Sequence, residues 1–244
     1  MEAYIVRHSL DAVLQLQDAT TGKSILERNV VFRENGKMVF FHYKGGGVYI
    51  IMNTPHVNTV YEIEAAGYET ARISVEYGES KKSYPMLEVS LIPKLTLHAE
   101  EAYGTLRGTM DGIEELEAVS LNTYTCFLQE YSAKKQQLTY YGKNELTGQE
   151  YALLHRDRKS YQRFQVRKEL SRTAILTRRP LEQPYAVNDP IVRIIKGQVE
   201  ESGAYLLRYR IESKTDSYLV RYVVRGETYY QTVDAQEPER KLGE

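Results

Sequence analysis

Short runs in which apolar and polar residues alternate, separated by glycine-rich and polar turns, constrain the fold of this chain more than any other feature. The pattern is clearest between Gly45 and Tyr77. In the run Val60–Ala65, the apolar residues at positions 61, 63 and 65 alternate with two glutamates. Successive side chains of a strand point to opposite faces, so this alternation predicts a half-buried strand. The strands predicted in this stretch are Val48–Met52, Val60–Ala65 and Thr70–Tyr77.

Four more runs of the same kind complete the first 93 residues: Ala12–Asp18, Asn29–Arg33, Met38–His42 and Met86–Ile92. Asn35-Gly36 separates the second and third of them and favours a type I′ hairpin, because both central residues of that turn need a positive φ. The Gly45–Gly47 triplet precedes a strand rather than a helix, which favours a bend over a phosphate-binding loop. Strands at this regular spacing predict a small antiparallel sandwich.

The order of these motifs over residues 9–93 resembles the transthyretin-like sandwiches of the carboxypeptidase regulatory-like and collagen-binding B-type repeat families. The motifs are a strand ending in D-A-T-T-G-K (residues 18–23), the N-G-K hairpin, a G-G-V-Y-I strand, and a tyrosine-bearing strand that runs into a G-Y turn. Tyr61, Gly67 and Tyr68 occupy the positions of this last motif. The resemblance implies a β-sandwich that serves as a spacer, adhesive or docking module, and it transfers no catalytic residue.

Pro93-Lys94 is the predicted domain boundary, followed by a β-rich domain over residues 94–235 and a polar tail over residues 236–244. Residues 112–119 are read either as a strand or as a short helix, because Ile113, Leu116 and Val119 have helical spacing. The other strands predicted before the long proline-containing loop are Leu95–His98, Gly104–Thr109, Asn122–Tyr131, Gln137–Tyr141, Tyr151–Arg156, Tyr161–Lys168 and Thr173–Arg178.

The last four runs, Ile191–Val199, Ala204–Ile211, Tyr218–Val224 and Thr228–Val233, predict a four-stranded meander. Tyr218–Val224 has apolar residues on both faces, which predicts a central strand covered on both sides. The expected fold is therefore all-β: a transthyretin-like antiparallel sandwich near residues 1–93, then a β-rich meander or barrel-like domain.

Motifs for catalysis, metals and cofactors are not found. The single cysteine, Cys126, excludes an internal disulfide, and its apolar neighbours favour a buried residue over a nucleophile. The five histidines have no metal-ligand spacing, and no nucleophile elbow occurs. Glu114, Glu115 and Glu117 are interpreted as a solvated acidic face rather than a catalytic carboxylate pair. We expect no cofactor, no metal and no enzymatic activity.

Charge is distributed unevenly along a chain whose net charge is only −1. Residues 62–130 carry 13 acidic and 5 basic side chains, whereas residues 151–180 carry 9 basic and 2 acidic ones. This asymmetry suits contact between copies, an anionic partner, or simply two solvated faces.

The basic segment 156–179 is the candidate interaction site, and Arg163 and Arg167 are expected to share one strand face. Within it, Tyr161 and Phe164 alternate with basic residues, a composition that single-stranded nucleic-acid platforms share. Contact with an acidic protein face and an ordinary surface are the alternatives. The candidate residues are Arg156, Arg158, Lys159, Arg163, Arg167, Lys168 and Arg172.

The sequence favours a non-enzymatic structural or docking subunit of a larger protein assembly. Tyrosine is abundant, with 21 residues against 5 phenylalanines, and suits strands and half-wet interfaces. No secretion signal or membrane span is visible, so we expect cytoplasmic synthesis and protein partners or self-association. Phage tails and contractile injection particles are assemblies of this kind. The alternatives are a glycan- or ligand-binding module, and a nucleic-acid binder acting through residues 156–179.

Overall fold

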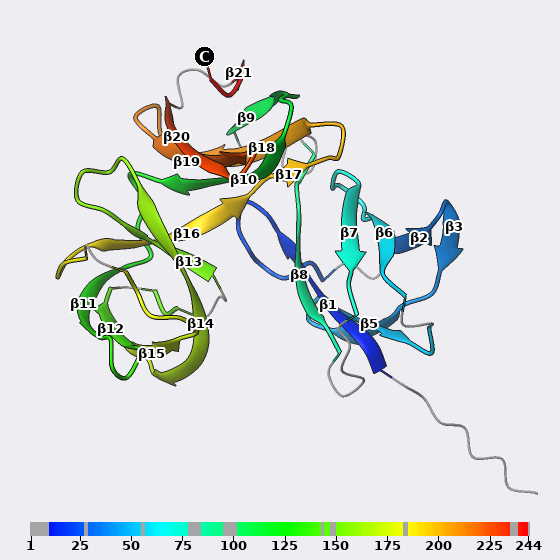
Figure 1. Ribbon diagram of the computed structural model, residues 1–244, viewed down its shortest axis with the longest axis horizontal. Coiled ribbons are helices and arrows are strands. Elements are labelled where there is room, and N and C mark those ends of the chain that lie inside the picture. The colour runs from blue at the N-terminus through cyan, green and yellow to red at the C-terminus, as the bar shows by residue number, and fades with distance from the viewer. Residues whose placement is uncertain are drawn as a thin grey trace, which may run out of the picture. The chain divides into compact units, whose positions relative to one another are not determined.

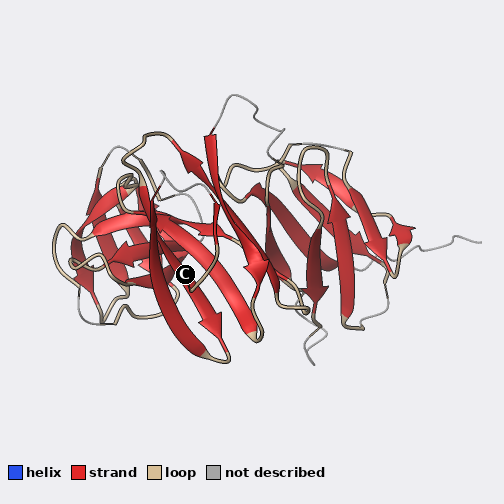
Figure 2. Cartoon of the chain, turned by 90° about the horizontal axis from the view of Figure 1, so that it is seen from above, coloured by secondary structure: helices blue, strands red, loops and turns tan. Residues whose placement is uncertain are grey.

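The computed structural model describes residues 10–26, 29–54, 57–77, 84–94, 102–142, 144–146, 150–182, 185–234 and 239–243. These residues form strands, turns and loops and no helix, which confirms the all-β prediction (Figure 2). Accordingly, none of them belongs to a helix that could cross a membrane. The chain divides into two compact units, residues 1–100 (unit 1) and 101–244 (unit 2). The boundary predicted from the sequence follows Pro93, and the observed division follows Glu100.

The described residues of unit 1 form two four-stranded sheets, with strand orders β4-β5-β1-β8 and β3-β2-β6-β7. The strands are β1 (Leu10–Asp18), β2 (Val31–Glu34), β3 (Lys37–Val39), β4 (His42–Gly45), β5 (Val48–Met52), β6 (Thr59–Glu64), β7 (Ala71–Val75) and β8 (Met86–Leu91).

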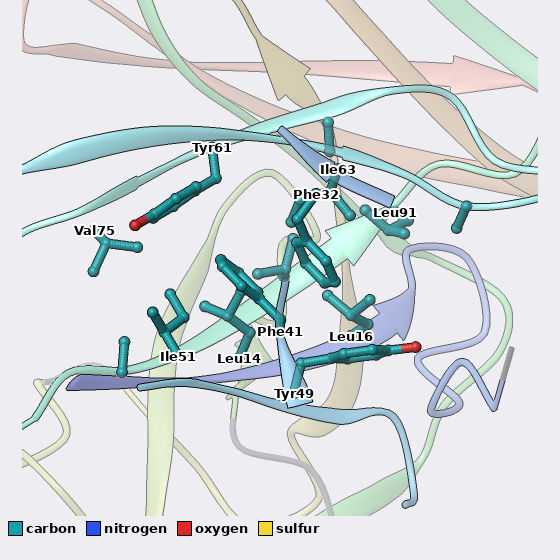
Figure 3. Packing of buried hydrophobic residues seen from close by; sticks show 14 of the residues in the cluster. Leu14, Leu16, Phe32, Phe41, Tyr49, Ile51, Tyr61, Ile63, Val75 and Leu91 are labelled. Atoms are coloured by element: carbon teal, nitrogen blue, oxygen red, sulfur yellow. The ribbon is translucent and has the colours of Figure 1, made fainter. Parts of the chain in front are cut away.

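The two sheets of unit 1 enclose one hydrophobic core, as the predicted sandwich requires (Figure 3). Leu14 and Tyr49 enter it from one sheet, and Phe32 and Ile63 from the other. On β6, Tyr61 and Ile63 point inward, while Glu62 and Glu64 form ion pairs with arginines on neighbouring strands. Period-2 alternation therefore reports which face of this sheet is buried.

Two of the sequence motifs of unit 1 meet at Asp18. Its Oδ1 accepts hydrogen bonds from the backbone N–H groups of Thr20 and Thr21, which closes the turn after β1. The hydroxyl of Tyr68, in the Gly-Tyr turn after β6, donates to Asp18 Oδ2 at 3.2 Å. The Asn35-Gly36 hairpin forms as predicted, since both residues have positive φ and β2 pairs with β3 directly across them.

Two details of unit 1 differ from the prediction. β8 pairs with β1 in parallel, so the sandwich is not purely antiparallel. The run Met38–His42 divides into β3 and β4, which belong to different sheets. The chain crosses between the sheets at Phe40 and Phe41, where Phe41 enters the core and Phe40 is 81% exposed. Alternation identifies a strand but carries no information on its direction or its neighbours.

The described residues of unit 2 form a nine-stranded large sheet and a four-stranded small sheet. The strands are β9 (Ala102–Thr109), β10 (Ile113–Ser120), β11 (Cys126–Ser132), β12 (Gln137–Tyr141), β13 (Glu150–Leu154), β14 (Tyr161–Ser171), β15 (Ala174–Thr177), β16 (Pro190–Lys196), β17 (Gln198–Val199), β18 (Ala204–Ile211), β19 (Ser217–Val224), β20 (Glu227–Asp234) and β21 (Glu239–Arg240).

Part of the large sheet closes on itself. Its order begins β11-β12-β15-β14-β13-β16, and β11 also pairs with β16, so these strands form a ring that we call the barrel (Figure 1). Every pair around the ring is antiparallel. Its core includes Cys126, Leu138, Phe164 and Ile175. The barrel-like alternative of the prediction is therefore the observed one.

Beyond the barrel, the large sheet continues through β10, β19 and β20, and it shares a hydrophobic core with the small sheet, β17-β18-β9-β21. The central strand β19 is covered on both faces, as predicted. Tyr218 and Val220 belong to this shared core, and Leu219 belongs to a separate cluster on the opposite face.

The meander predicted for the last four runs is wrong. Ile191–Val199 divides at Gly197 into β16 of the large sheet and β17 of the small sheet. A Cβ atom at Gly197 would lie 2.9 Å from Leu116 Cγ, so glycine permits this close passage. β18 pairs with β9, an early strand of unit 2, rather than with β19. The alternation of apolar and polar residues in β18 is compatible with either β9 or β19 as its partner strand.

Two further predictions of unit 2 can be compared. Residues 113–120 form a strand, which resolves the ambiguity at residues 112–119. The polar tail is not uniformly solvated, because Leu242 is 6% exposed and packs in the core between the large and small sheets. A single apolar residue has no periodicity from which its burial could be predicted. The predicted strand Leu95–His98 lies outside the described residues.

Candidate functional site

A pocket of about 360 Å³ lies at one end of the barrel. We call it the rim pocket. It forms where β11 begins, β13 turns into β14, and the chain enters β16; the pairings Cys126–Ile191, Phe127–Pro190 and Leu154–Tyr161 place these positions at the same end. Its lining residues are Tyr124, Phe127, His155, Arg156, Arg158, Val187, Asn188, Asp189 and Pro190.

Aromatic rings form one wall of the rim pocket. Phe127 alternates with Cys126 and Leu128, which point into the barrel, so its ring lies on the outer surface. The rings of Tyr124 and Phe127 pack edge to face, with their centroids 5.6 Å apart. The ring of Tyr141 stacks on that of Phe127, also with a centroid distance of 5.6 Å. Edge-on and stacked arrangements of this kind are the favoured geometries of aromatic pairs.

The β13–β14 loop supplies the cations of the rim pocket. Arg158 adopts a positive φ of 55°, and its backbone N–H donates to the carbonyl oxygen of His155 at 2.9 Å. Its guanidinium carbon lies 5.9 Å from the centroid of the Tyr124 ring, a cation–π contact. Residues 155–160 thus form the hairpin loop between β13 and β14.

Asp189 stabilises the third segment of the rim pocket, the loop that leads into β16. Its buried carboxylate accepts a hydrogen bond from the backbone N–H of Ala186 at 2.6 Å, and its Oδ1 lies 3.5 Å from Arg156 Nε. Asn188 adopts a positive φ of 73°, and its Oδ1 accepts a hydrogen bond from the hydroxyl of Tyr141 at 2.8 Å. The pocket is therefore assembled by fixed loops on a rigid barrel, the usual setting of recognition sites.

The structure brings only part of the predicted basic site together. Arg156 and Arg158 line the rim pocket, and the exposed Lys159 lies in the same loop. Arg172 lies in the turn after β14, at the opposite end of this 11-residue strand, which corresponds to about 35 Å. Its guanidinium is 3.5 Å from Glu145.

The middle of the basic segment is also divided. Arg163 forms ion pairs with Glu115 and Glu117 and is not a free surface cation. Arg167 and Lys168 are exposed, and a bulge between Val166 and Lys168 interrupts the alternation. The continuous arginine face expected from Arg163 to Arg167 is therefore broken.

The acidic run 114–117 is only in part the solvated face that the sequence suggested, because Glu114 and Glu115 are exposed and Glu117 is buried. Glu117 is 2% exposed and lies within 3.4 Å of the side-chain nitrogen atoms of three cations. Glu115 and Glu150 complete this group of three carboxylates and three cations, which we call the ionic cluster. The cations are Arg163 on β14, Lys196 on β16 and Arg221 on β19. These carboxylates are matched by neighbours that are distant in sequence, which a linear pattern does not show.

The ionic cluster changes the pKa values of its members. Burial opposes ionisation of Glu115, but the hydrogen bond from Arg221 and the charges of Arg163, Arg221 and Lys196 lower its pKa overall. Burial would lower the pKa of Lys196, yet Glu117 and Glu150 raise it overall. The hydroxyl of Tyr161 donates to Glu117 at 3.0 Å, and burial and that carboxylate raise the pKa of Tyr161. Matched charges of this kind join strands that are distant in the sequence.

The chemical groups of the rim pocket are suited to binding a ligand. The pocket combines aromatic faces, guanidinium groups and an amide around a small volume. In the described part of the chain, no group of three or more His, Cys, Asp or Glu side chains is arranged to hold a metal ion. Tyr124, Phe127 and Asn188 were not predicted from the sequence, because they come from two segments that are distant in the chain and meet only in the folded barrel. The only local signal in the sequence was Asp189-Pro190, which indicates a loop at Asn188.

Comparisons with known proteins identify no family. No protein-family model matches the chain, and no curated protein matches it significantly. Among solved structures, a chimeric titin Z1Z2–Z1Z2 tandem functionalised with a GRGDS peptide from fibronectin is 9% identical to this chain. The alignment covers 95% of each chain with a TM-score of 0.17, a value that supports no inference about fold or function.

Proposed function

We propose that this protein is a non-enzymatic docking subunit of a larger protein assembly. The observation that supports the proposal best is the rim pocket, in which exposed arginines and aromatic rings are fixed by a barrel. Arginine and tyrosine are the side chains most enriched in the energetic centres of protein interfaces. A pocket that presents arginine and tyrosine side chains, on loops held by hydrogen bonds, is suited to binding another macromolecule.

Exposed apolar residues on unit 1 also support docking. Phe40 is 81% exposed and Met38 is 68% exposed, and both lie at or beside β3, an edge strand of its sheet. The core of unit 1 has no need of Phe40, because Phe41 fills the inward position. Large apolar side chains beside an unpaired strand edge commonly mark interaction sites.

The assembly that we infer is a particle of the phage-tail or contractile-injection type. This inference is an analogy from fold to function, since all-β docking modules recur in such particles. The transthyretin-like resemblance of residues 9–93 is consistent with a spacer or docking role in it.

Co-expression tests the proposal. The full chain is produced together with the products of the genes that flank its own, and complexes are separated by size-exclusion chromatography and identified by mass spectrometry. We expect a stoichiometric complex or a self-associated form. Phe40→Ser should weaken this association while leaving the unfolding temperature unchanged. A monomer at every concentration, with no co-purifying neighbour, would contradict a docking role.

A glycan-binding module is the second candidate, favoured by the exposed ring of Tyr141 beside Phe127 and the amide of Asn188. Sugars stack on aromatic rings and form hydrogen bonds with amide groups, and the rim pocket offers both. A glycan array distinguishes the candidates: binding that disappears in Phe127→Ala, with no protein complex formed, would favour a glycan ligand.

A further inference from the structure

The two arginines of the rim pocket differ in their contacts. Arg156 lies beside the buried carboxylate of Asp189, which compensates its charge. Arg158 lies over the face of Tyr124, and no carboxylate among the described residues pairs with it. The lining thus carries one uncompensated positive charge among its arginine and aspartate side chains. A guanidinium on an aromatic face keeps its N–H groups free at the edge of its plane, where a carboxylate can accept two of them.

A second donor group faces the same volume. Asn188 Oδ1 accepts the hydrogen bond of the Tyr141 hydroxyl, which leaves the amide NH₂ group of Asn188 as a donor among the residues that line the rim pocket. The only carboxylate of the lining, Asp189, is already occupied by Ala186 and Arg156. The lining is therefore rich in donors and poor in free acceptors, which predicts an acceptor, and hence an anionic ligand.

The size and openness of the rim pocket indicate a side chain rather than a large cofactor. Its volume of about 360 Å³ is at the low end of the range for small-molecule sites. Val187 is 57% exposed at its edge, and the exposed Lys159 continues the surface beyond it. A partner that extends past the pocket, such as a polypeptide segment, can use this surrounding surface.

A nucleic-acid strand is a poorer fit. Binding along a phosphate backbone requires a track of successive cations. Here Arg163 is matched by Glu115 and Glu117, and Arg172 lies at the other end of β14. The rim pocket therefore offers one anion site and no track.

We infer that the rim pocket takes the carboxylate of an aspartate or glutamate side chain on a partner protein. The carboxylate accepts hydrogen bonds from Arg158 and the Asn188 amide, while the methylene stem of the acidic residue packs on Phe127. This inference rests on the proposed docking function and names the chemistry of the partner.

Matched peptide libraries test it. Immobilised acetylated hexapeptides, randomised except for one central position fixed as Asp, Glu, Asn or Gln, are probed with the full chain. We expect the acidic sets to retain the protein at least about tenfold more strongly than the amide sets, because charge-assisted bidentate bonds are lost in the latter. Retention should weaken as salt is added. Equal retention of acid and amide sets, or no retention of either, overturns the inference.

Three variants locate the binding. Arg158→Lys keeps the charge but loses the planar fork, and should weaken retention about tenfold. Asn188→Asp keeps the shape and the acceptor for Tyr141, but it removes the amide donor and adds a repelling charge, so it should abolish retention. Lys168→Ala removes a cation from the part of β14 that is distant from the rim pocket, and it should leave the retention unchanged. Retention that is insensitive to both rim-pocket variants contradicts the assigned site.

The co-expression experiment and the peptide experiment together distinguish failure of this inference from failure of the docking function. If the co-expression complex forms but acidic peptides are not retained, docking stands and the carboxylate site is wrong. If acidic peptides bind through Arg158 but no complex forms, the chemistry of the site stands and the docking subunit is wrong.

Discussion

At the residue scale, Glu117 shows how a buried charge is stabilised. Its carboxylate is almost inaccessible, yet Lys196 Nζ approaches to 2.9 Å and the arginines 163 and 221 complete its surroundings. Moving a carboxylate out of water is costly, and only near-ideal charge pairing offsets that cost. The group therefore specifies how β10, β14, β16 and β19 are arranged.

Replacing Glu117 should lower the unfolding free energy of unit 2. Glu117→Gln leaves three cations with only two carboxylates, those of Glu115 and Glu150, and we expect unit 2 to lose about 3 kcal/mol of unfolding free energy, because one positive charge of the cluster is no longer compensated. Urea unfolding followed by circular dichroism measures the loss. Glu114→Gln, an exposed neighbour, serves as the control and should change the value by less than about 0.5 kcal/mol. Equal effects of the two substitutions would show that the ionic cluster does not hold the strands together.

Cys126 provides a second prediction at this scale. It lies in the barrel core, and burial raises the pKa of Cys126 to about 12. The thiol should therefore resist a thiol-specific reagent at mildly alkaline pH in the native protein and react fully once urea unfolds the chain. Absorbance of the released chromophore measures both rates. Rapid labelling of the native protein would contradict the burial of this side chain.

At the element scale, β9 and β18 are fitted to each other by glycine–tyrosine pairs. Gly104 lies directly opposite Tyr209, and Gly108 lies opposite Tyr205. A Cβ atom at Gly104 would collide with the Tyr209 ring, and one at Gly108 would come within 2.6 Å of the Tyr205 hydroxyl. The rings therefore occupy the space above the glycines and fill the core between the two sheets of unit 2.

This arrangement reverses the usual effect of alanine in a strand. Gly→Ala normally stabilises a strand interior by reducing the freedom of the unfolded chain. Here we expect Gly104→Ala to destabilise unit 2 by about 1–3 kcal/mol, because the ring must move out of a packed core. Thermal unfolding gives the sign directly, with the exposed Thr109→Ala as the control. A rise in unfolding temperature for Gly104→Ala would contradict the proposed packing.

At the scale of the whole molecule, buried tyrosines should make the protein sensitive to alkali. Burial raises the pKa of Tyr61 to about 12 in unit 1, and burial and the Glu117 carboxylate raise that of Tyr161 in unit 2. The unfolded chain releases these protons near pH 10, before the folded chain does. The stability that they contribute is therefore complete below pH 10 and is lost as the pH rises through the folded values.

Acid acts differently on unit 2. The pKa of Glu115 is lowered in the folded state, so its contribution is present above the ordinary glutamate pKa and is lost as the pH falls through the folded value. Urea titrations across the pH range, read by circular dichroism and tyrosinate absorbance, test both limbs. Tyr61→Phe should reduce the alkaline loss of unit 1. An alkaline limb that is identical in this variant would contradict the assignment to Tyr61.

The separate cores of the two units predict a further behaviour of the whole chain. Residues 1–100 enclose their own sandwich core, and residues 101–244 enclose those of the barrel and of the two sheets of unit 2. We expect each segment, expressed alone, to unfold cooperatively. Calorimetry measures this, and a segment that lacks a transition would show that it depends on the rest of the chain.

Much of this fold could be predicted from local pattern. Turn chemistry at Asn35-Gly36 and alternation in Val60–Ala65 and Ala204–Ile211 identified a turn and two strands directly. The rim pocket could not be found in this way. Its arginines were candidates because of composition, but their aromatic partners and Asn188 become neighbours only when β11, β13 and β16 meet in the barrel.

The sequence by itself determined that the chain forms strands, where most of them turn, and which side chains face a core, because these properties depend on neighbours one to four residues away. Only the tertiary structure decided which strands pair, that the sheet of unit 2 closes, and that Glu117 is buried among three cations. Those outcomes depend on contacts between residues up to about a hundred positions apart, such as the pair Glu117–Arg221. Alternation of period two is satisfied equally by every possible partner strand, so it cannot choose among them.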